Sequence, residues 1–265
     1  MIAALPAGLA LGVGGLIGLV LGVIGGGGSI LAVPLLVYVV GVESPHVAIG
    51  TAALAVSVNA LAGLAMHARK TRLRWPCATA FSIAGVIGAL IGAATGKAVD
   101  GQSLLALFGL VMILVGASML RAKAQDSSTS VWLSRESASR LLPRLGLLGF
   151  GVGTLSGFFG IGGGFLIVPG LMLAARMGIG EAAAASLVAV AAFGLSSAAS
   201  YAWSGLVDWK VAALLVAGGI LGSLAGTRLL ALLTDRKALL TTIFAGIVIV
   251  AGLYVGTRGL LTLAA

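Results

Sequence analysis

At residues 19–34 the sequence reads LVLGVIGGGGSILAVP, so four consecutive glycines and a serine interrupt a run of aliphatic residues. A similar stretch, TLSGFFGIGGGFLIVP, follows at residues 154–169. Glycine in a helix interior costs roughly 1 kcal/mol relative to alanine, so consecutive glycines favour a break in the helix. The sequence therefore predicts two apolar helices that are each broken at a glycine-rich stretch.

The composition of the chain is typical of an integral membrane protein. Of its 265 residues, 60% are hydrophobic and 9% are charged, and the mean hydropathy is +1.18. Apolar runs recur at the length that crosses roughly 30 Å of hydrocarbon, and they lack strict polar alternation, which favours helices over a β-barrel. We therefore expect an all-α polytopic membrane protein that contacts the lipid bilayer. The net charge of +9 is spread over short loops, so no nucleic-acid partner is expected.

Glycine, proline and charged residues divide the chain into ten apolar segments, five before and five after a polar stretch at residues 121–140. We expect a first repeat of five helical segments at residues 1–120, a cytoplasmic connector at residues 121–144, and a second repeat of five helical segments at residues 145–265. The segments are predicted at residues 7–24, 30–40, 46–66, 75–96, 102–120, 145–159, 165–175, 181–203, 209–230 and 237–255.

The two halves match when one is shifted by about 135 residues, and so many coincident glycines indicate an internal repeat. Basic residues cluster after the third segment, within the connector, and between the ninth and tenth segments, which places these loops on the cytoplasmic side. Equivalent loops of the two halves then lie on opposite sides, so the repeat is inverted. The first two segments of each half are either full crossings or re-entrant hairpins, because both options fit this parity. The coincident residues include Gly22 with Gly157, Gly25 with Gly160, Gly28 with Gly163, Pro34 with Pro169, Trp75 with Trp209, and Gly85 with Gly219.

The second and seventh segments are too short to span a bilayer as helices. A half-helix that begins at Gly28 and Ser29 would present its first backbone amides to an anion inside the protein, because these amides have no acceptor within the helix and carry partial positive charge. Inversion would bring residues 162–164 to the same depth from the other side. The structural alternative is that these glycines only allow helices to pack closely.

Few other polar side chains lie at membrane depth. Thr51 and Ser186 are equivalent in the repeat and predict a pair of hydroxyls near the site, although a single hydroxyl in a membrane helix usually bonds its own backbone. Asn59 is costly to leave unpaired in lipid, so it should face the protein interior, either in an interhelical hydrogen bond or in contact with substrate. The expected substrate-binding residues are Gly26, Gly27, Gly28, Ser29, Thr51, Asn59, Gly162, Gly163, Gly164 and Ser186.

No Asp, Glu, Lys, Arg or His lies at the centre of a predicted segment. We therefore expect no intramembrane proton relay, and we expect no metal and no cofactor. An intramembrane enzyme such as a protease is a weaker alternative, because a serine protease needs a histidine base and both His46 and His67 lie at segment ends. An inside-negative potential drives an anion outward at about 2.3 kcal/mol per charge per 100 mV, so an uncharged interior favours export without a coupling ion. A passive anion channel is a further alternative.

The stretches GGGGSILAVP at residues 25–34 and GIGGGFLIVP at residues 160–169 are each followed by AIGTA or AAASL and then by a Trp-led, glycine-rich segment. This arrangement resembles the TauE/SafE family of membrane transporters, also called the sulfite exporter family, over nearly the whole chain. The resemblance implies a bacterial inner-membrane transporter of sulfite, sulfoacetate or related sulfur-containing organic anions. The chain departs from the family pattern at Ala52, where a serine is common, and Gly164 stands where the first half has Ser29. By position, the resemblance implies roles for residues 25–29, Pro34, Thr51, residues 160–164, Pro169 and Ser186.

Together these observations predict a multi-pass transporter of the cell inner membrane. Its expected partner is a small sulfur-containing anion such as sulfite or an organosulfonate, which it exports by alternating access around a site near the midplane.

Overall fold

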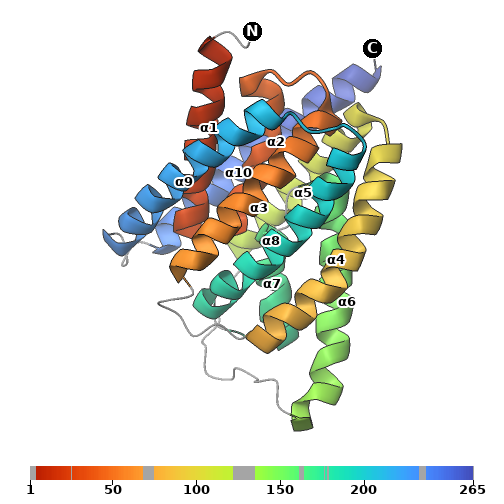
Figure 1. Cartoon of the computed structure of the whole chain (residues 1–265), viewed down its shortest axis with the longest axis vertical. Coiled ribbons are helices and arrows are strands. Elements are labelled where there is room, and N and C mark those ends of the chain that lie inside the picture. The colour runs from red at the N-terminus through yellow and green to blue at the C-terminus, as the bar shows by residue number, and fades with distance from the viewer. Residues whose placement is uncertain are drawn as a thin grey trace.

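The computed structural model describes residues 4–24, 26–67, 75–121, 135–160, 164–175, 177, 179–232 and 237–264 (Figure 1). These residues form helices joined by short turns, and no strand occurs among them, which confirms the predicted all-α class. The first half contains α1 (Ala4–Ile24), the 3₁₀-helix η1 (Gly26–Leu31), α2 (Ala32–Leu35), the π-helix η2 (Leu36–Val40), α3 (Pro45–His67), α4 (Trp75–Ala98) and α5 (Gly101–Arg121). The second half contains α6 (Arg135–Phe159), α7 (Gly164–Ala175), α8 (Ile179–Trp203), α9 (Trp209–Leu232) and α10 (Lys237–Ala264).

Seven helices are long and apolar enough to cross a membrane, namely α3, α4, α5, α6, α8, α9 and α10. Three shorter apolar stretches, at Ala7–Val23, Gly28–Val40 and Leu166–Ala175, belong to α1, to the η1–α2–η2 segment and to α7. The described part of the chain is therefore a multi-pass membrane protein, as the composition predicts. Among the seven candidate spans, those in α3 and α8 have the largest buried share, so these two helices form the centre of the molecule.

The helices of the two halves pack in reciprocal pairs. Helix α1 packs against α9, and the equivalent helix of the second half, α6, packs against α4. Helices α3 and α8 pack against each other, as do α5 and α10. An approximate two-fold relation between the halves would give this pattern, because it would exchange each contact with its counterpart, and the inverted repeat itself stays a prediction.

Glycines bring the paired helices into backbone contact. A Cβ atom at Gly14 of α1 would lie 2.5 Å from the carbonyl oxygen of Leu215 in α9. A Cβ atom at Gly149 of α6 would lie 2.5 Å from the carbonyl oxygen of Phe81 in α4. The four residues are related by a shift of about 135 residues, so the same close approach is built twice. Small residues at such interfaces let membrane helices pack through their backbones.

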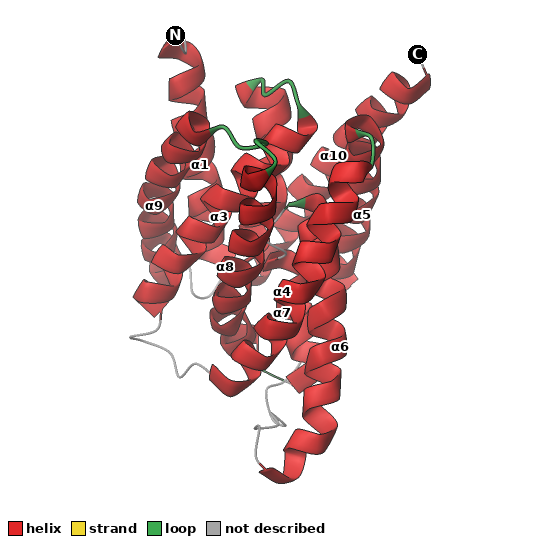
Figure 2. Ribbon diagram, turned by 45° about the vertical axis from the view of Figure 1, so that its right-hand side comes forward, coloured by secondary structure: helices red, strands yellow, loops and turns green. Residues whose placement is uncertain are grey.

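Equivalent helices run in opposite directions along the long axis of the molecule. Figure 1 shows α1 starting at the top, beside the label for the N-terminus, whereas α6 starts at the bottom. Helix α4 runs from the bottom toward the top, whereas α9 runs from the top toward the bottom. Figure 2, turned by 45°, shows α1 beside α9 and α4 beside α6. These directions are those expected of halves with opposite orientation, while the placement of either end in a membrane stays a prediction.

The C-terminal part of the predicted connector is helical, while its placement on the cytoplasmic side stays a prediction. Helix α6 begins at Arg135, so residues 135–144 are helical, and the helix continues through Pro143. The predicted boundary followed the loss of apolar residues, but polarity marks only where a segment leaves lipid and not where its helix ends. The rest of the predicted connector, residues 122–134, lies outside the described residues, as does the basic loop at residues 68–74.

Candidate functional site

The predicted helix breaks occur at equivalent positions. Helix α1 ends at Ile24, and α6 ends at Phe159. Gly160 follows α6 with a φ angle of +63°, a left-handed conformation that commonly ends helices and favours glycine. A Cβ atom at Gly160 would also lie 3.0 Å from the carbonyl oxygen of Ile49 in α3, so the end of α6 rests directly on the central helix.

The chain after each break is built differently in the two halves. The prediction placed the start of a half-helix at Gly28 and Ser29, but the 3₁₀-helix η1 already begins at Gly26. It continues through only four α-helical residues into η2, where Gly41 ends the segment with a φ angle of +82°. Pro34 lies in this path, but its counterpart Pro169 lies inside the regular helix α7, so the proline alone does not explain the irregularity. In the second half α7 is a continuous 12-residue helix.

The two glycine-rich segments meet inside the protein. Element η1, which contains Gly26 and Gly27, packs against α7, which begins at Gly164. Ser29 is fully buried, and Gly164 is buried as well. Segments about 135 residues apart in the chain thus lie side by side, one from each half. Of the predicted site residues, Gly162 and Gly163 lie outside the described residues.

Gly28 has a packing role. A Cβ atom there would lie 2.7 Å from the backbone nitrogen of Leu21 and 3.1 Å from the carbonyl oxygen of Ile17, both in α1. Glycine at this position therefore lets η1 fold back closely onto α1, which is the structural alternative considered for the glycine-rich stretch. A side chain at this position would have to separate the two segments.

Thr51 and Ser186 make different hydrogen bonds, although the repeat makes them equivalent. The backbone N–H of Asp208, in the turn between α8 and α9, donates to Thr51 Oγ1 over 2.9 Å. The Ser186 hydroxyl donates to the carbonyl oxygen of Ala183 in its own helix over 2.7 Å. Both side chains are fully buried. Thr51 therefore joins the two halves, whereas Ser186 makes the local bond that is usual for a hydroxyl in a membrane helix.

Asn59 faces the protein interior, as expected of an amide in a membrane helix. It is 1% exposed, and its amide group lies directly against Gly219 of α9, with the amide oxygen 2.8 Å from the place that a Cβ atom would take. Asn59 Oδ1 has no hydrogen-bond partner among the described residues. In the second half the phenyl ring of Phe193 lies against Gly85 of α4 in the corresponding way. One half thus places an amide where the other places an aromatic ring.

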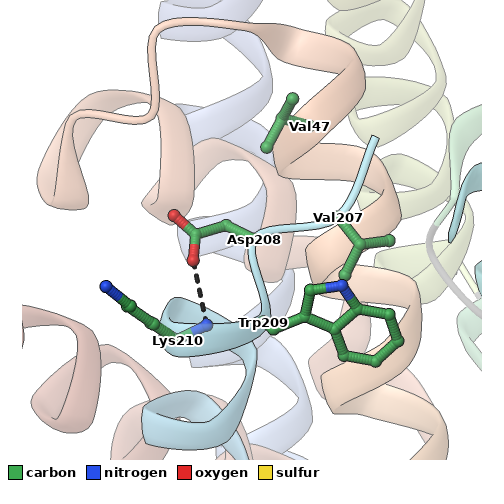
Figure 3. A pocket seen from close by; sticks show the side chains of 5 residues that line it. All are labelled: Val47, Val207, Asp208, Trp209 and Lys210. Carbon is green, nitrogen blue, oxygen red and sulfur yellow. Dashed lines mark hydrogen bonds between the residues drawn. The ribbon is translucent and has the colours of Figure 1, made fainter. Parts of the chain in front are cut away.

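A shallow, open pocket of about 500 Å³ lies where α9 begins, beside α3 (Figure 3). Its lining residues are Val47, Val207, Asp208, Trp209 and Lys210. The Asp208 carboxylate accepts hydrogen bonds from the backbone N–H groups of Lys210 and Val211 over 3.0 and 3.1 Å, so it caps α9 and occupies the position that an anion would take. Thr51 lies one helical turn beyond Val47. This pocket was not predicted from the sequence, although an aspartate directly before a Trp-led helix is a recognisable capping signal.

The glycine-rich segments do not border either of two surface pockets, the one beside α9 and an apolar groove on α10, because no described residue of η1 or α7 lines them. No group of three or more His, Cys, Asp or Glu side chains with the spacing of a metal site occurs in the described ranges. The candidate site is therefore a buried meeting point of two helix starts, with backbone amides and hydroxyls as its polar groups.

Comparisons with known proteins agree with this architecture. The family model described as sulfite exporter TauE/SafE matches residues 10–255. A probable membrane transporter protein of Xylella fastidiosa (strain Temecula1) is 47% identical over 255 residues, which cover 96% of this chain and 97% of the relative. The probable membrane transporter protein YunE of Bacillus subtilis is 31% identical over 236 residues, which cover 79% and 85% of the two chains. No solved structure shows significant similarity to the chain.

The family match spans nearly the whole chain, and the relatives carry the names of transporters rather than of enzymes. The fold and the paired breaks described above are consistent with that class. The chain therefore belongs to the sulfite exporter TauE/SafE family and is a membrane transporter rather than an enzyme.

Proposed function

We propose that the protein exports a small sulfur-containing anion, of the sulfite or organosulfonate type, across the cell inner membrane by alternating access. The observation that carries the proposal is the packing of η1 against α7, since it brings the two helix breaks of a sulfite exporter family member to one place in the interior. Broken helices at matching positions of two inverted repeats are the usual construction of a transporter's substrate site.

The chemistry of this place suits an anion. The first four N–H groups of α7 have no acceptor within the helix, and the helix dipole adds partial positive charge at Gly164. Ser29 contributes a buried hydroxyl on the facing segment. Backbone amides and hydroxyls bind a sulfite or sulfonate group without a permanent positive charge, so the substrate is held and still released.

The contacts of Thr51 suggest how one end is kept closed. Its hydrogen bond to the backbone N–H of Asp208 joins α3 of the first half to the α8–α9 turn of the second. Gly50 tightens this junction, because a Cβ atom there would lie 2.8 Å from Tyr201 Cβ. In the proposed cycle this junction opens when the opposite end closes.

Flux measurements with purified protein in proteoliposomes test the proposal. Sulfite, thiosulfate and a series of sulfonates are loaded inside, and efflux is followed with and without an imposed potential. We expect saturable efflux and counterflow for at least one of these anions, and a potential that drives anions outward should accelerate it, since about 60 mV is worth a factor of ten per charge. Efflux that does not saturate and shows no counterflow would indicate a channel. Efflux of none of these anions, or efflux that ignores the potential, would contradict the proposal.

A pair of valine substitutions tests the position of the site. Gly163→Val adds a side chain at the predicted site and should abolish efflux while the protein still inserts in the membrane. Gly12→Val is the control, because nothing lies within 4 Å of a Cβ atom at Gly12. Efflux from Gly163→Val at the wild-type rate would contradict the assignment of the substrate site to the glycine-rich segments.

A further inference from the structure

An apolar groove of about 560 Å³ runs along one face of α10. Its lining residues are Gly246, Ile247, Val250, Ala251 and Tyr254. They recur at helical spacing on a face different from the one that packs on α5, where Gly252 contacts Met112 and Gly109. From Gly246 to Tyr254 the groove extends about 12 Å along the helix, which is most of the depth of one leaflet.

The groove is open rather than filled by a neighbouring helix. A Cβ atom at Gly246 would meet nothing within 4 Å. Ile247 is 50% exposed and Val250 is 67% exposed, so both side chains border the groove without being covered. The surface is large enough for an acyl chain, and its lining is almost entirely apolar.

Aromatic rings and a cation lie at one end of the groove. The rings of Tyr254 and Tyr38, from η2, meet edge to face with centroids 5.2 Å apart. The guanidinium carbon of Arg258 lies 5.7 Å from the centroid of the Tyr254 ring, one helical turn beyond the groove. Tyrosine and arginine near a span's end are the residues that hold lipid headgroups at the membrane interface.

Within the part of the chain that the structure describes, Arg258 is exposed and its side chain contacts Tyr254 rather than a carboxylate. Its position is four residues before Thr262, where the candidate span of α10 ends, so the guanidinium reaches the headgroup level while the groove lies beside the acyl chains.

We propose that this groove binds an anionic phospholipid, with one acyl chain along Gly246 and Val250 and the phosphate beside Arg258 and the two tyrosines. The occupant follows from charge complementarity, because a phospholipid with net negative charge supplies both the apolar chain and the missing counter-charge. The groove lies on the exposed face of α10, and Tyr254 at its end contacts Tyr38 of η2, in the segment that contains η1.

Lipid titration of the intact protein in detergent tests this site. Phosphatidylglycerol and phosphatidylcholine with the same acyl chains are added separately, and bound lipid is counted by native mass spectrometry while the thermal unfolding midpoint is recorded. Wild-type protein should bind phosphatidylglycerol more tightly and gain the larger midpoint shift. Arg258→Gln should weaken phosphatidylglycerol binding about fivefold, the factor that about 1 kcal/mol per basic residue near a headgroup represents, and should weaken phosphatidylcholine binding less, because the choline cation already offsets the charge of its phosphate.

Gly246→Leu fills the groove without a steric clash and should weaken the binding of both lipids, whereas Gly12→Leu, at an equally open glycine of α1, should weaken neither. Equal binding of the two lipids to wild-type protein would overturn the proposal. So would an unchanged affinity in Arg258→Gln. A change from dimer to monomer in Gly246→Leu would also overturn it, because it would assign the groove to a second copy of the chain.

Discussion

The α1–α9 interface and the α6–α4 interface use glycines at equivalent positions, whereas the side chains at the centre of the two halves differ. Gly18 packs on the backbone of Gly219 in one interface, and Gly153 packs on the backbone of Gly85 in the other. The side chain that covers Gly219 from the central helix is Asn59, but the side chain that covers Gly85 is Phe193.

The interface glycines support the packing of both halves, whereas the side chains that differ between the halves are candidates for the substrate site. Backbone contacts must be nearly the same in both halves if the halves are to exchange roles between two conformations, so glycines recur. The polar groups face no such requirement if the substrate is an asymmetric anion such as the proposed sulfonate, because such an anion has one charged end and binds in one orientation. Thr51 and Ser186 follow the same rule, since only Thr51 bonds across the halves.

The largest expected effect comes from the scaffold. Gly18→Val and Gly153→Val each place a Cβ atom on the backbone of the opposing helix, so the paired helices must move apart. Each variant should lose more than about 3 kcal/mol of stability, and little monodisperse protein should remain by size-exclusion chromatography in detergent. Gly12→Val and Gly146→Val are the controls, because nothing lies within 4 Å of a Cβ atom at either position. If only one of the two variants, Gly18→Val or Gly153→Val, kept wild-type stability, the two interfaces would not be equivalent.

The central pair should respond with opposite signs. Phe193 is fully buried and stacks on Phe81 with ring centroids 6.0 Å apart, so Phe193→Ala should cost about 3 kcal/mol through the cavity it leaves. Asn59→Leu removes a buried oxygen without a hydrogen-bond partner and should raise stability by about 1 kcal/mol. Thermal unfolding in detergent measures both, and flux shows whether Asn59 contributes to transport. A loss of stability in Asn59→Leu would mean that its amide is paired in the folded protein.

The two equivalent hydroxyls offer a smaller contrast. Thr51→Val keeps the shape of the side chain but leaves the Asp208 N–H without its acceptor, so it should cost about 1–2 kcal/mol. Ser186→Ala removes only a bond to its own helix and should change stability by less than about 0.5 kcal/mol. Equal losses of stability in the two variants, measured by thermal unfolding, would show that the hydrogen bond between the halves contributes no more than the local one.

The smallest effect is expected at an exposed cap in the first half. The backbone N–H of Ser103 donates to the Asp100 carboxylate at the start of α5, and this bond lowers the pKa of Asp100 below its ordinary value of 3.8. The ionised cap therefore stabilises the folded state at neutral pH, and this contribution is lost as the pH falls below about 4. Thermal unfolding midpoints between pH 7 and pH 3 should fall less in Asp100→Asn than in wild-type protein. Parallel pH profiles would show that the cap does not contribute.

Periodicity and length predicted the long helices well. The predicted starts at Trp75 and Trp209 agree with the structure, and so do the ends at Ile24 and Phe159. These boundaries are marked by glycine, tryptophan or charge, which directly change local helix stability or membrane depth. Helix α6 begins ten residues before the predicted apolar segment, because residues 135–144 are largely polar and give no apolar run to follow.

The candidate site could be predicted only in outline. The meeting of η1 with α7 follows from the repeat, but the 3₁₀ and π geometry around Pro34 depends on packing against α1. The packing role of Gly28 and the bond from Asp208 to Thr51 join segments that are distant along the chain or folded back on each other. Such contacts have no periodic signal in the sequence, so residue types alone could not assign them.

Anomalous diffraction from crystals soaked with selenite, a heavier analogue of sulfite, tests the central claim most directly once sulfite flux has been measured. The account predicts a selenium peak between η1 and the start of α7, within hydrogen-bond distance of backbone amides near Gly164. A selenium peak elsewhere in the interior of a transport-active protein, with η1 and α7 packed against each other and no anion between them, would contradict it.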